Sequence, residues 1–226
     1  MRNILNIAHR GFTKVFPDNT LEAFEAAIQI GVDGIECDVQ ETADHRFVVF
    51  HDSELLGQDI GKLSLGEIQN VKLKGKFKIP TLEQTLDLCK KRVRVVVELK
   101  KVQMVDRLLR LSRSIMEPTE IIIASFNRDL VSKTSNQAPE IETAIITSRP
   151  PEDLIRLAES AECDIIIVRF PFATAELAEK VHAHNLSIFV WDCAGLRDVI
   201  DALGLDINGI ISDFPDLVMK ELGRAV

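Results

Sequence analysis

The 226-residue sequence has few cysteines, no long apolar run and no excess of basic residues. Its four cysteines are scattered without a Cys-x-x-Cys pair, which argues against a disulfide framework or a zinc site. The apolar run at 165–168 stops at Arg169, and no other run approaches the ~18 residues of a membrane span. A formal net charge of −8 argues against a general nucleic-acid surface, which needs a basic stripe. Because a strand-like run begins within the first few residues, no signal peptide is expected. The sequence therefore predicts a cytoplasmic protein without stable membrane insertion.

The rest of the sequence alternates short apolar runs with amphipathic stretches. Strand-like runs occur at 4–8, 34–39, 46–50, 93–98, 121–125, 143–147, 165–168, 187–191 and 208–212. Helical patterns occur at 19–31, 81–91, 102–116, 127–136, 151–160, 173–185, 195–203 and 214–222. Capping-box pairs predict where two of these helices begin, Asn19 with Glu22 and Thr81 with Gln84.

The second and third strand-like runs are too close in sequence to be parallel neighbours. Only Glu41 to His45 separates them, whereas a parallel crossover needs roughly a dozen residues, so 46–50 is predicted to be an antiparallel return arm. Eight parallel strands then remain, each followed by a helix. This count predicts a (β/α)8 TIM barrel formed by one domain over 1–226, with an extra antiparallel hairpin arm after strand 2 and a short insertion before helix 81–91.

An open doubly wound sheet is the alternative architecture. Its phosphate-binding loop normally shows a glycine-rich turn after the first strand. Residues 9–12 read His-Arg-Gly-Phe, so that fingerprint is missing and the barrel is favoured.

Carboxylates lie on the second parallel strand and at the end of the third, toward the barrel end where catalytic groups gather. Glu36 and Asp38 are two residues apart and lie on one face of a strand, and Glu98 ends the run VRVVV. Three acids at close range need a cation, and oxygen ligands suit Mg²⁺ or Ca²⁺. For Glu98 the alternative is an ion pair with Lys100, two residues further on.

Two histidines and two cations accompany these acids. His9 follows the first strand, and the hairpin folds His51 back to the level of Asp38. Histidine serves as a general acid or base near neutral pH. Arg10 and Lys100 are the cations suited to hold a phosphate group.

Two further residues at strand ends are open to different interpretations. Trp191 ends the run SIFVW and either forms a pocket wall or packs as an aromatic of the rim core. Asp213 is predicted to cap the final helix in preference to a hydrogen bond within the rim.

The motifs around these residues run through the whole chain in order. They are HRG at 9–11, PDNTLEAF at 17–24, GIECDV at 34–39, FVVFHD at 47–52, IPTLEQTL at 79–86, VVVELK at 95–100, ASF at 124–126, FVW at 189–191 and GIISDFPD at 209–216. With this combination the chain resembles the glycerophosphodiester phosphodiesterase family, which is related to bacterial phosphatidylinositol phospholipase C.

The resemblance implies hydrolysis of a small-molecule glycerophosphodiester to sn-glycerol 3-phosphate and an alcohol, with the neighbouring glycerol hydroxyl attacking phosphorus. It also implies a Mg²⁺ or Ca²⁺ cofactor. The resemblance implies that Glu36, Asp38 and Glu98 are the metal ligands. It implies that His9 and His51 are the acid–base pair, and that Arg10 and Lys100 contact the phosphate.

The chain departs from the family pattern at three places. Asp18 stands where the family has Glu in P-E-N-T, the usual W-T-V-N reads Trp-Asp-Cys-Ala at 191–194, and the segment 53–80 is short. These departures leave the alcohol and the role of Asp18 open. A phosphodiesterase acting on lysophospholipids or a catalytically silent phosphodiester-binding protein are the alternatives, and the oligomeric state stays open.

Overall fold

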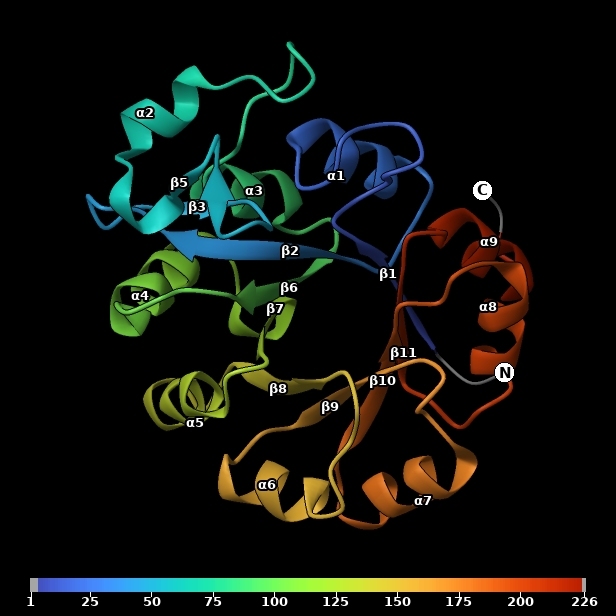
Figure 1. The fold of residues 1–226 in the computed structure, drawn as a ribbon. Helices are drawn as coiled ribbons and strands as arrows, with labels where there is room; N and C mark the ends of the chain where they lie inside the picture. Colours follow the sequence, from blue (N-terminus) through green and yellow to red (C-terminus); the bar gives the residue numbers. More distant parts are fainter. Residues whose placement is uncertain (1–3, 225–226) are drawn as a thin grey trace.

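The computed structural model describes residues 4–224, and within them eight parallel strands close into a barrel (Figure 1). Around the ring the order is β1, β11, β10, β9, β8, β7, β6 and β2, and β2 pairs with β1 to close it. These strands are β1 (Leu5–His9), β2 (Gly34–Glu41), β6 (Arg94–Leu99), β7 (Ile121–Ser125), β8 (Glu142–Thr147), β9 (Ile165–Arg169), β10 (Ser187–Trp191) and β11 (Gly209–Ser212). The predicted TIM barrel is confirmed, and the open sheet is excluded because the ring has no free parallel edge.

Helices alternate with the barrel strands along the chain and lie outside the ring (Figure 1). They are α1 (Leu21–Gln29), α3 (Leu82–Cys89), α4 (Val105–Ile115), α5 (Arg128–Gln137), α6 (Leu154–Ser160), α7 (Ala175–Ala183), α8 (Leu196–Leu203) and α9 (Pro215–Glu221). Their ends agree with the predicted ranges to within a few residues. Each helix packs one apolar face on the strands, as the 3.6-residue periodicity requires.

β3 (Phe47–Val49) is the antiparallel arm predicted after the second strand. Its register pairs Val39 with Val49, and the backbone N–H of Phe50 donates to the carbonyl of Asp38 at 2.9 Å. The hairpin therefore returns the chain to the level of Asp38 one residue before His51. The predicted convergence of this histidine with the acids is confirmed.

The insertion between β3 and α3 forms a small layer of its own. Its elements are β4 (Glu54–Leu55), β5 (Gln58–Asp59), a 3-10 helix (Ile60–Lys62) and α2 (Leu65–Asn70). Its apolar side chains are used to build a separate cluster. The buried members of that cluster are Val48, Leu55, Ile60, Leu63, Ile68 and Ile79.

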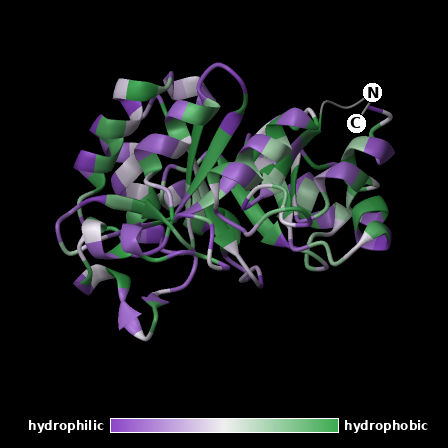
Figure 2. Cartoon of the chain, turned by 90° about the horizontal axis from the view of Figure 1, so that it is seen from above, coloured by the Kyte–Doolittle hydropathy of each residue, from purple (hydrophilic) through white to green (hydrophobic). Residues whose placement is uncertain are grey.

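The barrel is filled with apolar side chains rather than open. In Figure 2 the strands are mostly green, whereas the helices carry green and purple on different faces. On β11, a side chain at Gly209 would meet the Phe189 ring at 3.0 Å, so a larger residue there would require the ring to shift. Within residues 4–224 no helix combines the length and apolar character needed to cross a membrane.

Two of the predicted helix caps are wrong. Thr20, not Asn19, caps α1, and its side chain accepts the backbone N–H of the third helical residue. Asp213 does not cap the last helix, whose N-cap is Phe214 without a side-chain cap bond. In both cases the polar side chain is used in a tertiary contact instead. The capping box of Thr81 with Gln84 is confirmed.

Candidate active site

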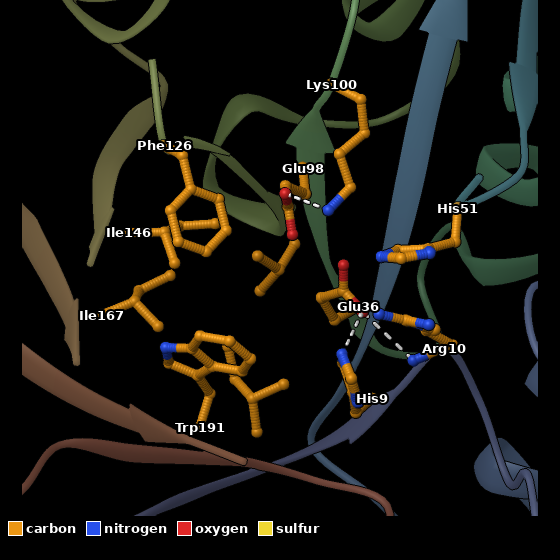
Figure 3. A pocket seen from close by; sticks show the side chains of 12 residues that line it. His9, Arg10, Glu36, His51, Glu98, Lys100, Phe126, Ile146, Ile167 and Trp191 are labelled. Carbon is orange, nitrogen blue, oxygen red and sulfur yellow. Dashed lines mark hydrogen bonds and ion pairs between the residues drawn. The ribbon is translucent and has the colours of Figure 1, made fainter. Parts of the chain in front are cut away.

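A pocket of about 160 Å³ opens where the barrel strands end (Figure 3). It is lined by His9, Arg10, Glu36, His51, Val96, Glu98, Lys100, Phe126, Ile146, Ile167, Trp191 and Ile211. Seven of the eight residues predicted from the sequence as site residues belong to this lining. The eighth, Asp38, is fully buried and contacts two of the lining cations.

The three predicted carboxylates form one buried cluster. Glu36, Asp38 and Glu98 each offer an oxygen atom, and these atoms lie within 4.8 Å of one another. The parallel register of β2 and β6 places Asp38 directly beside Glu98. Adjacent strands of the closed ring thus hold the acids at a fixed spacing without any loop.

Burial and mutual repulsion perturb the acids unequally. Burial, and after it the charge of Asp38, raises the pKa of Glu36 to about 8. Burial also raises the pKa of Glu98. For Asp38 burial acts in the same direction, but Lys100 and Arg10 outweigh it, so the pKa of Asp38 is lowered. For Glu36 and Glu98, the neighbouring cations therefore do not compensate for burial and for the repulsion between the carboxylates.

Arg10 and Lys100 lie against the cluster. The Arg10 Nε atom is 3.1 Å from Asp38 Oδ2, and Lys100 Nζ is 3.0 Å from Asp38 Oδ1. Lys100 also pairs with Glu98, so the ion-pair interpretation of Glu98 and its place in the acid cluster both hold. Each cation lies beside a carboxylate and lines the pocket.

The donor set fits a hard divalent cation. Glu36 Oε1 is buried and has no hydrogen-bond partner within residues 4–224. A buried carboxylate oxygen without a donor is costly unless a cation satisfies it. Three such carboxylates within 4.8 Å of one another match the all-oxygen preference of Mg²⁺ and Ca²⁺.

His9 is held by an aspartate from the far end of the sequence. Its Nδ1 atom is 2.7 Å from Asp213 Oδ1, and its Nε2 atom is 3.8 Å from Glu36 Oε2. Burial lowers the pKa of His9, but Asp213 and Glu36 outweigh this effect and the net pKa is raised. The contact also explains why Asp213 does not cap α9. With Nδ1 engaged by Asp213, the other ring nitrogen faces the cluster.

His51 is more exposed and is fixed through its backbone. Its Nδ1 atom is 2.8 Å from Asp52 Oδ1. Gln40, only 1% exposed, donates from Nε2 to the carbonyls of Phe50 at 2.8 Å, His51 at 3.3 Å and Asp52 at 2.6 Å. One amide thus holds three consecutive carbonyls of the His51 loop. Sequence reasoning missed Gln40, although it continues the inward-facing alternation of Glu36 and Asp38.

Asn19, which was predicted to cap the first helix, instead binds Asp38. Its Nδ2 donates to Asp38 Oδ2 at 2.7 Å, and the backbone N–H of Asp38 donates to Asn19 Oδ1 at 3.2 Å. The residue adopts a left-handed backbone with φ of 55°, which asparagine tolerates better than most residues. Neighbouring Asp18 lies 3.6 Å from Arg10 and is half exposed.

Apolar side chains form the opposite wall of the pocket. The rings of Phe126 and Trp191 meet edge to face with centroids 5.9 Å apart. Trp191 also packs on the barrel core, so both interpretations of it hold. After it, Asp192 pairs with Arg169 at 2.6 Å, which gives this departure from the family pattern a structural role.

Comparisons with known proteins point to one family. The model of the glycerophosphoryl diester phosphodiesterase family matches residues 9–217. A glycerophosphodiester phosphodiesterase of Bacillus altitudinis is 27% identical over 94% of this chain and 96% of its own length. One from Caldanaerobacter subterraneus subsp. tengcongensis is 27% identical over 96% of each chain. A solved phosphodiesterase from Oleispira antarctica, in complex with the product sn-glycerol-3-phosphate, superimposes with a TM-score of 0.90 at 21% identity over 96% of each chain.

Proposed function

The chain belongs to the glycerophosphoryl diester phosphodiesterase family and is a phosphoric diester hydrolase, and from this premise we propose how its own residues perform the reaction. The proposed reaction is metal-dependent hydrolysis of a glycerophosphodiester to sn-glycerol 3-phosphate and an alcohol. The observation that supports it best is a cluster of three buried carboxylates, two of which line one pocket together with two histidines. The product held by the Oleispira antarctica neighbour is consistent with this substrate class.

Glu36, Asp38 and Glu98 are the proposed ligands of the metal ion. When bound, Mg²⁺ or Ca²⁺ would neutralise charge on the phosphate oxygens and polarise the attacking hydroxyl. Arg10 and Lys100 line the pocket beside these acids and supply the remaining positive charge for the phosphate.

His9 and His51 are the proposed acid–base pair. The hydroxyl next to the phosphate attacks phosphorus, one histidine accepts its proton, and the other protonates the departing alcohol as the P–O bond breaks. Water then opens the cyclic phosphodiester with the two roles exchanged. Asp213 and Asp52 each contact Nδ1 of their histidine, so that Nε2 of each ring is the atom that exchanges protons with the substrate.

The size of the pocket favours small leaving groups over long acyl chains. A lysophospholipid needs an apolar track at the rim for its chain. Of the apolar residues of 53–80, Leu55, Ile60, Leu63, Ile68 and Ile79 are buried in a cluster of their own, and the pocket measures about 160 Å³. We therefore propose water-soluble glycerophosphodiesters as the substrates.

The test is release of sn-glycerol 3-phosphate from glycerophosphocholine and glycerophosphoethanolamine with Mg²⁺, Ca²⁺ or EDTA. We expect turnover that needs a metal and is lost in His51→Ala. The matched control is His184→Ala, which removes an exposed histidine at the end of α7 and leaves turnover unchanged. Turnover that persists in EDTA contradicts the proposed metal dependence. Absence of turnover in a folded, metal-loaded protein contradicts the proposed substrate class.

A further inference from the structure

A lysine-rich hairpin stands out against the acidic character of the chain. Residues 72–78 read Lys-Leu-Lys-Gly-Lys-Phe-Lys, and all four lysines are exposed. None of them has an ion-pair partner among residues 4–224, although the chain as a whole has a net charge of −8. Four unpaired positive charges in seven residues create a local field opposite in sign to that of the protein.

The hairpin is held against the loop that follows the first active-site strand. The backbones of Leu73 and Phe77 exchange hydrogen bonds of 2.8 and 3.0 Å. The Phe77 ring packs edge to face on Phe16 with centroids 6.1 Å apart. Phe16 lies in the connection between His9 and α1, so the lysines are presented beside the active site.

A second groove joins the hairpin to the active site. It measures about 410 Å³ and is bordered at one part by His9 and Arg10, which also line the active-site pocket, and at another by Lys74. A ligand that leaves the pocket past these two shared residues therefore enters a groove with a lysine on its wall.

The other cations of this groove are already paired. His9 contacts Asp213, Arg10 contacts Asp38 and Asp18, and Lys14 contacts Asp216. Lys74 is the lining cation without a carboxylate partner in the described part of the chain. An anion reaching it displaces no existing ion pair, so the Coulomb attraction is not offset by breaking another contact.

We propose that this groove binds a second phosphate group of the substrate, with Lys74 as its contact and Lys76 as a supporting charge. The inference rests on the proposed function and narrows it to phosphodiesters that carry a further phosphate. A membrane surface fits the hairpin less well, because Leu73 and Phe77 are partly covered by the fold and present no exposed apolar tip. The groove also shares His9 and Arg10 with the catalytic pocket, so it can receive part of a small ligand bound there, whereas a bilayer cannot enter it.

The test compares two substrates that differ by one phosphate, glycerophosphoglycerol and its derivative phosphorylated on the terminal glycerol. We expect the wild type to favour the phosphorylated diester in kcat/KM at low salt. The double variant Lys74→Gln/Lys76→Gln should lower that preference by about fivefold, and added salt should do the same. Turnover of glycerophosphoglycerol itself should change little.

The matched control is Lys180→Gln/Lys220→Gln, which removes the same charge from the last turns of α7 and α9, at the opposite end of the barrel. This control should keep the wild-type preference. Equal use of both diesters by the wild type, or a preference that survives in Lys74→Gln/Lys76→Gln, overturns the inference but leaves the proposed function intact. Loss of binding to anionic phosphatidylglycerol vesicles in that variant, with an unchanged substrate preference, would assign the lysines to a membrane instead. No turnover of either diester or of glycerophosphocholine overturns both proposals.

Discussion

The rim of the barrel has two halves of opposite chemistry. β1, β2 and β6, with the hairpin arm, supply the carboxylates, the histidines and the two cations. β7 to β10 supply apolar side chains such as Phe126, Ile146 and Trp191, which face the charged half across the pocket (Figure 3). An apolar wall excludes water and strengthens electrostatic interactions at the opposite side. The charged half is therefore expected to determine the rate, and the apolar half to determine how the substrate fits.

The largest effect should come from the acid cluster. Glu98→Gln replaces one carboxylate by an amide of the same shape. We therefore expect kcat/KM for glycerophosphocholine to fall about 10³-fold, and the metal concentration needed for half-maximal activity to rise. Glu179→Gln, on the exposed face of α7, is the matched control and should behave as the wild type. Near-normal activity of folded Glu98→Gln would remove this residue from the proposed ligand set.

Gln40→Ala should have the next largest effect. Loss of the amide frees three carbonyls of the His51 loop, so we expect kcat to fall between about tenfold and 10²-fold with a nearly constant KM. Gln40→Asn, which keeps the donor on a shorter side chain, should recover part of the rate. If Gln40→Ala and Gln40→Asn lose the same amount of thermal stability and the same amount of kcat, Gln40 stabilises the fold and does not position His51.

On the apolar half, Trp191→Ala should act mainly on binding. Removing one partner of the Phe126 pair is expected to raise KM about fivefold with little change in kcat. Steady-state kinetics of Trp191→Ala and Trp191→Phe, side by side, measure this. A large loss of kcat in Trp191→Phe would contradict the proposal that the charged half determines the rate and the apolar half determines how the substrate fits.

The smallest effect is on stability and depends on pH. Because the pKa of Glu36 is raised to about 8 from 4.5, the metal-free folded protein keeps a proton that the unfolded chain has lost between these pH values. Its stability should therefore fall as pH rises through this window. Glu36→Gln should not show this contribution and should melt several degrees higher at pH 8 in EDTA.

Calorimetry at pH 5 and pH 8 makes the comparison directly. The difference between wild type and Glu36→Gln should grow with pH, and Mg²⁺ or Ca²⁺ should raise the melting temperature of the wild type alone. A difference that is independent of pH would mean that burial does not perturb Glu36 as described.

Most of the fold was predictable because its signals are local. Strands such as 121–125 and 187–191 are marked by unbroken apolar runs, and both predicted ranges agree with the structure. The hairpin followed from a connection too short for any other pairing. The same local geometry brought His51 to the acids, so the centre of the site was also predictable.

The supporting residues were not predictable, because their side chains fit two explanations equally well. Asn19 and Asp213 both precede helices, where such residues commonly serve as caps. In the folded protein Asn19 binds Asp38, 19 residues away, and Asp213 binds His9, 204 residues away. The local sequence does not indicate whether such a side chain binds the helix N-terminus or a residue far away in the chain.

By itself, the sequence determined the alternation of strands and helices, and with it the two strands that carry Glu36, Asp38 and Glu98. Periodicity decides this because it depends only on neighbours along the chain. Closure of the ring decided the rest. It placed β1 beside both β2 and β11 and brought Asp213 to His9, while packing of Phe77 on Phe16 put Lys74 on the groove beside the active site. These contacts join distant segments, and only a closed barrel defines which distant segments meet.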